Sequence, residues 1–291
     1  MNLLLKLTIY TITKMVGPER IKKTISAFAN YSGLDLLFIA YNNLGILKFE
    51  NHIISGEHFL VTKVLKKNLG IITRPVIFDV GANVGNYSII LKKEFHQAHI
   101  YAFEPNEKTF EQLKTNVENS STIKCINAGL GTEEKTETIY TYSDDLLSSH
   151  ASIYDDVFRT FHKRSDIVEI EFQMTTLDLF CEREKIQCID FLKIDTEGNE
   201  LNVLKGATKM LSEGNIKIIQ FEFGECDVFS RVFLKDFYTI LFDYNIYRLD
   251  TDRLIPLFEY NVINEIFHFQ NFIAVRKDFP FQDELQNLPW Q

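Results

Sequence analysis

The sequence predicts an α/β protein with a doubly wound, mostly parallel sheet, and two observations carry that prediction. Short buried runs rich in β-branched and aromatic residues recur along the chain, and segments with helical spacing of apolar residues alternate with them. The turns after the first two runs contain glycine or acidic residues, which is typical of ligand sites at the carboxyl ends of parallel strands.

Residues 76–93, VIFDVGANVGNYSIILKK, give the first strand, turn and helix. Residues 76–78 indicate a buried strand, and a helical pattern begins at Ile89. Between them, Gly81 and Gly85 let the backbone turn sharply and let a ligand approach main-chain atoms. An ordinary glycine turn between core elements is the alternative interpretation.

The spacing of this turn fits neither common phosphate-binding motif. It lacks both the G-x-G-x-x-G pattern and the Gly-Lys-Ser/Thr ending of a P-loop. Asp79 would repel phosphate and accept hydrogen bonds from an ammonium group or ribose hydroxyls. A cofactor with an amino acid, a ribose and an adenine but no phosphate fits better, and S-adenosylmethionine is such a cofactor. The residues expected to bind it here are Asp79, Gly81, Asn83, Gly85 and Asn86.

A second acidic residue, Glu104, follows the buried run at residues 100–103. It lies about 20 positions after Gly85, the spacing at which an acidic residue binds ribose hydroxyls, because a carboxylate can accept two hydrogen bonds. A solvated loop acid is the alternative. Asn106 is expected to cap the following helix. Pro105, Asn127 and Ala128 complete the predicted cofactor site.

Three further buried strands and two closing strands are expected along the rest of the chain. They fall at residues 122–131, 188–195, 216–223, 245–250 and 270–277, with an amphipathic helix at about residues 230–244. Gly206 and Ala207 are expected within the helix after the fourth strand. One rim of the sheet should then carry Asp79, Glu104, Asn127, Asp195 and Glu222.

The segment KIDTEGNE, residues 193–200, concentrates acidic residues after the fourth strand. Asp195 is expected to point into the cleft where cofactor and acceptor meet. Glu200 should begin the next helix, where negative charge is favourable. Glu197 could cap, line the pocket or bind a cation, and Lys193 could pair with one of these acids.

Five blocks of this chain resemble, in order and spacing, those of the FkbM family of methyltransferases: FDVGANVGNYS, YAFEPN, NAGLG, TTLDLF and FLKIDTEGNELNVLKGA. The resemblance covers about residues 55–275. It implies a class I, Rossmann-like fold with an antiparallel last strand, the cofactor S-adenosylmethionine, and methyl transfer to a hydroxyl oxygen, often of a sugar or another secondary metabolite. The expected domains are a helical accessory segment at residues 1–68 and an FkbM-type domain at residues 69–291.

Methyl transfer to an alcohol requires alignment of the reactants and removal of a proton. Asp195 and His150 are the candidate bases, and Glu197 is a third candidate catalytic residue. His150 lies in a polar loop, DDLLSSHASIYDD, where a lone histidine is more often a solvated surface residue than a catalytic one. Alternatively, Asp195 and Glu222 could hold a divalent cation. Magnesium is the cation that related sugar O-methyltransferases use, but no ligand pattern in the sequence identifies a metal site.

Two other function classes stay open: the same fold acting on a nitrogen or a carboxylate, and a non-catalytic module that binds S-adenosylmethionine. The expected partner is a small-molecule or glycan acceptor. A net charge of −9 argues against nucleic acid, which is bound chiefly through clustered Lys and Arg. The oligomeric state is not predicted.

The four cysteines form no CxxC pair and no zinc spacing, so reduced thiols in a cytoplasmic protein are expected. The apolar residues 1–16 contain Lys6 and Lys14 and fall short of the ~20 residues that span a bilayer. No small-residue cleavage site follows, so neither a transmembrane segment nor a secretory signal is expected. Residues 1–68 should instead pack on the core or cover the cofactor mouth, with peripheral membrane binding or partner docking as the alternative.

Overall fold

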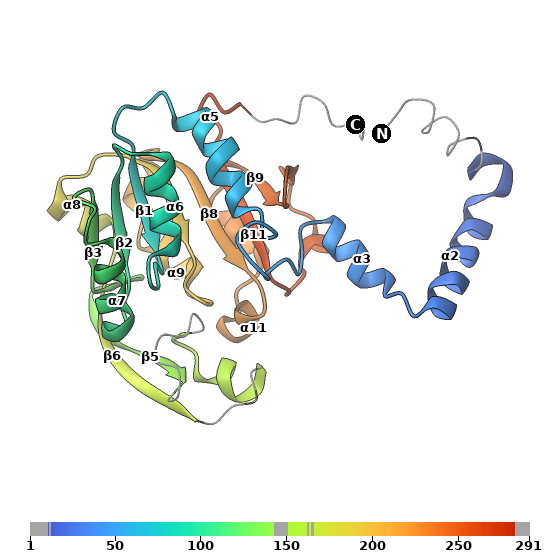
Figure 1. Cartoon of the computed structure of the whole chain (residues 1–291), viewed down its shortest axis with the longest axis horizontal. Helices are drawn as coiled ribbons and strands as arrows, with labels where there is room; N and C mark the ends of the chain where they lie inside the picture. The colour runs from blue at the N-terminus through green and yellow to red at the C-terminus, as the bar shows by residue number, and fades with distance from the viewer. Residues whose placement is uncertain (1–10, 12, 143–150, 162, 164–165, 283–291) are drawn as a thin grey trace. The chain divides into compact units, whose positions relative to one another are not determined.

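The computed structural model describes residues 11, 13–142, 151–161, 163 and 166–282 (Figure 1). The chain forms two compact units, residues 1–43 and 44–291. The first unit contains α2 (Pro18–Ser32) and α3 (Leu36–Asn43). The second unit begins with α4 (Glu57–Phe59), η1 (Leu60–Leu65) and α5 (Lys66–Leu69), so the first compact unit is shorter than the accessory segment expected over residues 1–68.

The second unit is built on an eight-stranded sheet with the order β10-β9-β11-β8-β7-β1-β2-β3. The five neighbouring parallel strands are β3 (Ile123–Ile126), β2 (His99–Phe103), β1 (Val76–Val80), β7 (Ile189–Ile194) and β8 (Ile216–Phe223). The antiparallel strands are β11 (Gln270–Arg276), which lies between β8 and β9 (Tyr244–Leu249), and β10 (Leu254–Pro256) at the edge. This order confirms the predicted class I methyltransferase fold and its antiparallel last strand.

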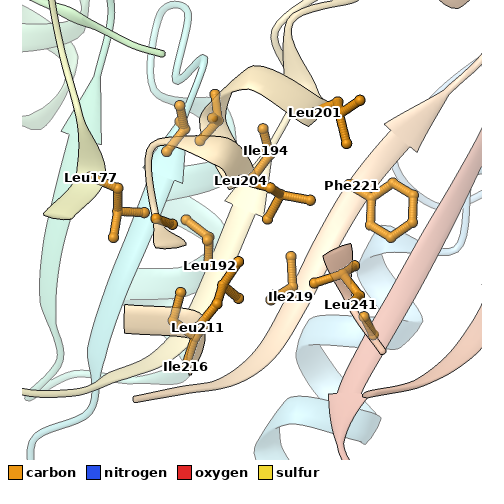
Figure 2. Close-up of a cluster of buried hydrophobic side chains, with 14 of the residues drawn as sticks. Leu177, Leu192, Ile194, Leu201, Leu204, Leu211, Ile216, Ile219, Phe221 and Leu241 are labelled. Atoms are coloured by element: carbon orange, nitrogen blue, oxygen red, sulfur yellow. The ribbon is translucent and has the colours of Figure 1, made fainter. Parts of the chain in front are cut away.

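The parallel strands are apolar because both faces of the sheet are covered. Consecutive residues of β7 alternate between two clusters, since Leu192 packs in one and Phe191 in the other. In Figure 2, Leu192, Ile194 and Phe221 of the strands pack with side chains of the covering helices. Burying a Leu or Phe side chain stabilises the fold by ~1.5–3 kcal/mol, so these clusters hold the ends of β1, β2 and β7 in place.

The helices that follow these strands largely match the prediction. α6 (Asn86–Glu94) follows β1, and α7 (Glu107–Val117) is capped by Asn106, whose Oδ1 accepts a hydrogen bond of 3.1 Å from the Lys108 backbone N–H. The placement of Gly206 and Ala207 within a helix is wrong. They lie between α9 (Glu200–Lys205) and α10 (Thr208–Ser212), because Ala207 leaves helical geometry at φ −110° and ψ 20°.

The helix predicted at about residues 230–244 is shorter than expected. α11 (Cys226–Ser230) is followed by Arg231, whose φ of 57° is left-handed and stops the helix, and α12 (Leu234–Ile240) begins after it. α8 (Leu177–Glu184) precedes β7 and is capped by Thr176. Among the described residues, no helix combines the length and apolarity that crossing a membrane requires.

A second sheet, with the order β4-β6-β5, was not predicted. It contains β4 (Gly129–Leu130), β5 (Lys135–Tyr142) and β6 (Ile167–Thr175), and Figure 1 shows β5 and β6 beneath the lower edge of the main sheet. The strand predicted at residues 122–131 is therefore split. β3 ends at Ile126 in the main sheet, and β4 pairs with β6 in the second sheet.

Candidate functional site

Every backbone N–H of the turn between β1 and α6 donates to an acceptor within the protein. The five N–H groups of residues 81–85 donate to Phe103 O (from Gly81 at 3.1 Å and Ala82 at 2.8 Å), Glu104 Oε2 (from Asn83 at 2.9 Å), Asn83 Oδ1 (from Val84 at 2.8 Å) and Ala82 O (from Gly85 at 2.8 Å). A phosphate cradle needs several free N–H groups that converge on one point. The turn therefore does not offer one, in agreement with the sequence.

Gly81 holds this turn against the end of β7. Its φ of 80° lies in the left-handed region that favours glycine. A Cβ at this position would lie 1.7 Å from the carbonyl oxygen of Asp195. The Asp195 N–H also donates to Val80 O at 3.0 Å. The glycine turn and Asp195 are thus in direct contact.

One cavity, which we call cavity A, lies at the carboxyl ends of β1, β2 and β7 and measures about 620 Å³ including its open mouth. Its acidic lining residues are Glu104, Asp195 and Glu197. No Lys or Arg of the described residues lines it. Much of its apolar wall comes from the second sheet and the residues near it: Leu130, Ile139, Ile153, Phe172 and Met174. Cavity A therefore suits a ligand with an apolar ring and a positive charge.

The structure brings part of the predicted cofactor site together. The predicted residues that line cavity A are Gly81, Asn83, Glu104, Pro105 and Ala128. Four others do not line it.

Those four residues lie outside the lining of cavity A. Asp79 is fully buried, and its Oδ2 accepts a 2.6 Å hydrogen bond from Ser88 Oγ. Gly85 precedes α6, and Asn86 is the exposed first residue of that helix. Asn127 is exposed and donates to Glu104 O at 3.0 Å, so it holds the segment that carries Glu104.

The Glu104 carboxylate is buried and fixed by two backbone donors. Its oxygens accept hydrogen bonds of 2.9 Å from the N–H groups of Asn83 and Asn106. Burial raises the pKa of Glu104 to about 7, although these two bonds act in the opposite direction. Each oxygen retains a lone pair, so Glu104 can still accept a hydrogen bond from a ligand hydroxyl.

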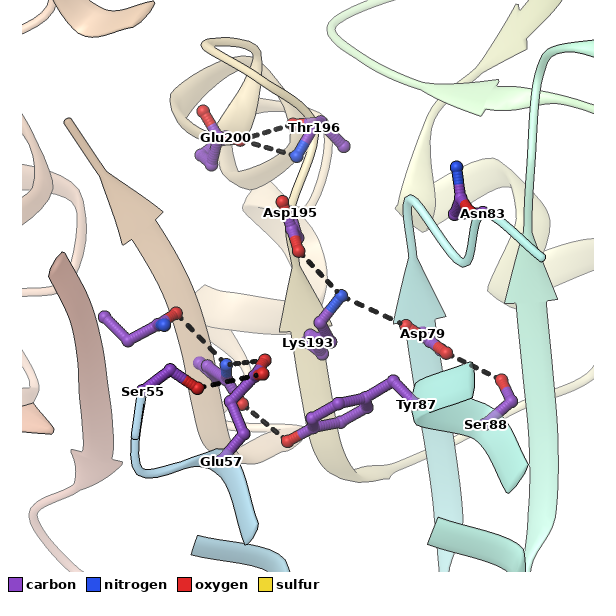
Figure 3. A network of polar contacts seen from close by, with 12 residues as sticks. Ser55, Glu57, Asp79, Asn83, Tyr87, Ser88, Lys193, Asp195, Thr196 and Glu200 are labelled. Carbon is purple, nitrogen blue, oxygen red and sulfur yellow. Dashed lines mark hydrogen bonds and ion pairs between the residues drawn. The ribbon is translucent and has the colours of Figure 1, made fainter. Parts of the chain in front are cut away.

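A buried lysine joins Asp195 to Asp79 (Figure 3). Lys193 Nζ lies 3.0 Å from Asp195 Oδ2 and 3.5 Å from Asp79 Oδ1, which confirms the expected pairing of Lys193 with an acid of its segment. Burial alone would lower the pKa of Lys193, but Asp195, Asp79 and Glu57 raise it above its ordinary value. The ammonium therefore stays charged beneath the site.

Of the other acids in this segment, Glu200 begins α9 as predicted and is buried. Its Oε1 accepts hydrogen bonds from Thr196, and its Oε2 accepts one of 2.9 Å from Gly198 N. Glu197 Oε2 accepts from Cys226 Sγ at 3.3 Å, and its side chain lines cavity A. His150 lies outside the described residues.

A second cavity, cavity B, measures about 1470 Å³ including its open mouth and shares Gly81, Asn83, Asp195 and Glu197 with cavity A. Its remaining walls come from three segments of the chain: residues 49–57, residues 222–226 and residues 269–271. The carboxylates that line it are Glu57, Asp195, Glu197, Glu222 and Glu225. No Lys or Arg of the described residues lines it.

Glu222 stands apart among these acids. Within the described residues, its carboxylate has no hydrogen-bond donor or cation beside it, whereas Glu225 pairs with His268 Nδ1 at 3.0 Å. Burial raises the pKa of Glu222 well above its ordinary value, and Asp195 and Glu197 add to the increase. The sequence placed Glu222 on the rim of the sheet but missed Glu57 and Glu225. For Glu57 a signal existed, because it lies in the SGEHFLVTKVL segment at the start of the family resemblance.

The expected metal option gains no support from the geometry. Within the described ranges, no group of three or more His, Cys, Asp or Glu side chains is arranged to hold a metal ion. Asp195 and Glu222 therefore do not form part of a recognisable cation site.

A family model described as the methyltransferase FkbM domain matches residues 79–246. Methyltransferase sdnD from Sordaria araneosa is 29% identical over 158 residues, which cover 46% of this chain and 61% of that protein. The hexuronic acid methyltransferase AglP from Haloferax volcanii is 29% identical over 150 residues, which cover 51% of this chain and 56% of that protein. The chain thus spans about three fifths of the length of these two relatives.

The 31-O-demethyl-FK506 methyltransferase FkbM from Streptomyces tacrolimicus is 28% identical over 184 residues, which cover 53% of this chain and 70% of that protein. Among solved structures, precorrin-6y C5,15-methyltransferase from Geobacter metallireducens aligns with a TM-score of 0.39 and 12% identity, over 81% of this chain and 97% of that one. The assignment to a family rests on the sequence match and on the strand order of the sheet.

Proposed function

Because this chain belongs to the FkbM family of methyltransferases, we propose that it transfers the methyl group of S-adenosylmethionine to a hydroxyl of a sugar, a glycan or a secondary metabolite. The observation that carries this proposal is the position of Asp195, which lines both cavity A and cavity B. A donor in one cavity and an acceptor in the other would meet at this residue.

Cavity A fits the cofactor by the chemistry of its lining. Glu104 would accept hydrogen bonds from the ribose hydroxyls, and the apolar wall that includes Phe172 and Met174 would pack against the adenine. Asp195 and Glu197 would lie near positive charge, and the absence of Lys and Arg from the lining suits a cofactor without phosphate. When bound, the cofactor supplies an electrophilic methyl group and retains the electron pair of the carbon–sulfur bond.

The protein's own contribution would be positioning and proton removal. Asp195 would accept a hydrogen bond from the acceptor hydroxyl, orient its oxygen toward cavity A, and take its proton as the new oxygen–carbon bond forms. Lys193 would hold the Asp195 carboxylate in place, since the two groups are 3.0 Å apart. Glu197, which lines both cavities, and His150 stay as alternative bases.

The test has a binding part and a turnover part. Calorimetry should give tight binding of S-adenosylmethionine and S-adenosylhomocysteine and little binding of NAD or ATP. Incubation with methyl-labelled donor and a panel of nucleotide sugars, glycosides and amines should label a hydroxyl-bearing acceptor. Tight NAD binding without binding of S-adenosylmethionine would overturn the cofactor assignment. If only amines are labelled, the methyl acceptor is a nitrogen atom and not a hydroxyl oxygen.

Three further parts of the proposal rest on the sequence. A cytoplasmic location is supported by the four cysteines, which are all unpaired in the structure. The exclusion of nucleic acid rests on the net charge of −9. The accessory role of residues 1–68 is supported by their helices and by the many exposed apolar side chains of α2 and α3, such as Phe28 and Leu37.

A further inference from the structure

We infer that cavity B selects an acceptor that carries hydroxyl or amino groups and no acidic group, so that neutral and amino sugars are substrates and uronic acids are rejected. This inference rests on the proposed function, because it takes cavity B as the acceptor site. It concerns the choice among acceptors rather than the existence of methyl transfer.

The charges around cavity B carry the first half of the inference. Five carboxylates line it, and none of the described Lys or Arg side chains does. The nearby cations are already engaged: Lys193 contacts Asp195 and Asp79, and His268 contacts Glu225. Among the described side chains that line the cavity, the only basic one is His52, so an acceptor carboxylate would face Glu222 without a lysine or arginine to balance it.

The pKa of two lining groups supports the same conclusion. Burial raises the pKa of Glu57 and of Glu222. Nearby carboxylates raise the pKa of Glu222 further, whereas at Glu57 the Lys193 charge opposes the rise and Asp195 adds to it. The cavity therefore disfavours even the negative charges that the protein itself places there. An additional anion would be less favourable still, whereas hydroxyl and ammonium groups can donate hydrogen bonds to these oxygens.

A chain of hydrogen bonds beneath cavity B supplies a second, independent observation (Figure 3). Ser55 Oγ donates to Glu57 Oε2 at 3.1 Å, and Glu57 Oε1 accepts from Gln220 Nε2 at 3.2 Å. Gln220 Oε1 accepts from the Tyr87 hydroxyl at 2.7 Å, and Gln220 Nε2 also donates to Asn271 Oδ1 at 3.1 Å. Because a Glu57 carboxylate only accepts hydrogen bonds, it fixes the orientation of the Gln220 amide.

The orientation of Gln220 fixes that of Asn271. The Asn271 side chain is buried, with 5% of its surface exposed, and its oxygen faces Gln220. Asn271 lines cavity B, and within the described residues its NH₂ group has no acceptor. The NH₂ group is not among the fully buried polar atoms that lack a partner, so it is open to donate to water or to a ligand. Asn271 would therefore donate to a hydroxyl oxygen of the acceptor while the surrounding carboxylates accept from its other hydroxyls.

The experiment uses the whole chain saturated with S-adenosylhomocysteine and three methyl glycosides of the same ring: glucoside, glucosaminide and glucuronide. Their binding is measured by ligand-observed NMR titration. The glucuronide should bind at least tenfold more weakly than the glucoside, and the glucosaminide at least as tightly as the glucoside. A glucuronide that binds as well as the glucoside overturns the inference, and so does the absence of binding by all three.

A charge-reversal pair sharpens the result. Glu222→Lys places a cation in cavity B and should reduce the preference for glucoside over glucuronide at least tenfold. Glu259→Lys makes the same change of net charge at an exposed position and should leave the preference unchanged. Equal shifts in both variants would attribute the preference to overall charge and overturn the inference. If Glu222→Lys fails to bind S-adenosylhomocysteine, the binding of the three glycosides to the wild-type protein decides the question.

The outcomes separate the inference from the proposed function. If the glucoside binds selectively but no acceptor of the panel is methylated, the proposed function is refuted and the inferred selectivity of cavity B stands. If methyl transfer occurs with a preference for the glucuronide, the proposed function stands and the inferred selectivity is refuted.

Discussion

Lys193 Nζ lies 3.0 Å from Asp195 Oδ2, so the carboxylate that borders both cavities is anchored by a buried ammonium group. The same ammonium lies 3.5 Å from Asp79 and 5.0 Å from the centre of the Tyr87 ring. Its contacts tie β7 to β1 and α6. The position of Asp195 is therefore set by the core of the sheet and not by a surface loop alone.

The variant Asp195→Asn should lower turnover by about 10²-fold or more, which is the usual contribution of a general base. The substitution keeps the shape and much of the hydrogen bonding of the side chain, so binding of the donor should weaken only slightly. Single-turnover rates at saturating donor measure the effect, with the exposed Asp252→Asn as the control. A rate equal to that of the wild type would show that Asp195 is not catalytic. A raised KM for the donor with unchanged kcat would assign it to binding of the methionine part.

The variant Lys193→Met should reduce the free energy of unfolding by ~3–5 kcal/mol, because removal of the lysine leaves the fully buried Asp79 carboxylate uncompensated. Lys193 is only 4% exposed, so solvent cannot replace the lost charge. Chemical denaturation measures the change. Lys67→Met, at an exposed position of α5, should change stability by less than about 0.5 kcal/mol. Similar values for the two variants would show that Lys193 contributes no more than a surface lysine.

The variant Glu104→Ala should weaken binding of S-adenosylhomocysteine by ten- to a hundredfold. Hydrogen bonds to a charged group contribute about 1.5–3 kcal/mol, which corresponds to that range of affinity. Part of the loss would come from the turn, since Glu104 also accepts from the N–H of Asn83. Calorimetry on the folded variant checks this. Undiminished affinity would mean that the ribose binds elsewhere.

The affinity for S-adenosylhomocysteine should rise with pH. The pKa of Glu104 in the free protein is raised to about 7 by burial, so its carboxyl group is mostly protonated at pH 6 and mostly ionised at pH 8. If ribose hydroxyls bind the ionised form, affinity should increase about tenfold across this interval. Glu104→Gln, which cannot ionise, should give a flat profile, and a wild-type profile equally flat would contradict the prediction.

The same raised pKa has the opposite effect on the stability of the free protein. The folded state holds the proton of Glu104 more tightly than the unfolded state does. Its contribution to stability is therefore full below the unfolded pKa of about 4.5 and is lost as the pH rises through about 7.

The variant Gly81→Ala should lower both stability and donor affinity. An alanine in the left-handed region costs about 1–2 kcal/mol, and its Cβ would also meet the carbonyl oxygen of Asp195. Gly33→Ala is a useful control, because Gly33 has a φ of 71° but no atom within 4 Å of the added Cβ. Calorimetric titration should show weaker donor binding for Gly81→Ala only. If both variants bind the donor as the wild type does, the close contact with Asp195 has no functional role.

The sequence predicted the parts of the site that are local along the chain. Gly81, Glu104 and Asp195 each follow or end a buried apolar run, and such runs are recognisable from their composition alone. The burial of each side chain could not be predicted in the same way. Asp79 was expected at the ligand, but its side chain is fully buried and bonded to Ser88.

The features that could not be predicted from the sequence depend on contacts between segments that are distant in the chain. Glu57 and Asn271 both bond to Gln220 because β11 runs beside β8 and residues 55–57 lie near Gln220. The second sheet was missed for a related reason. β5 and β6 pair with each other across an intervening stretch of more than 20 residues, and β6 has few buried positions to mark it as a strand.

The two cavities draw on different parts of the chain relative to the family match at residues 79–246. Every residue that lines cavity A falls inside those bounds, whereas residues 49–57 and 269–271 of cavity B fall outside them. On the proposed roles of the two cavities, part of the acceptor site would lie outside the matched stretch, while Glu222 and the residues that both cavities share lie inside it. Exchange of these two flanking segments between family members would be a route to altered acceptor specificity that leaves the donor site untouched.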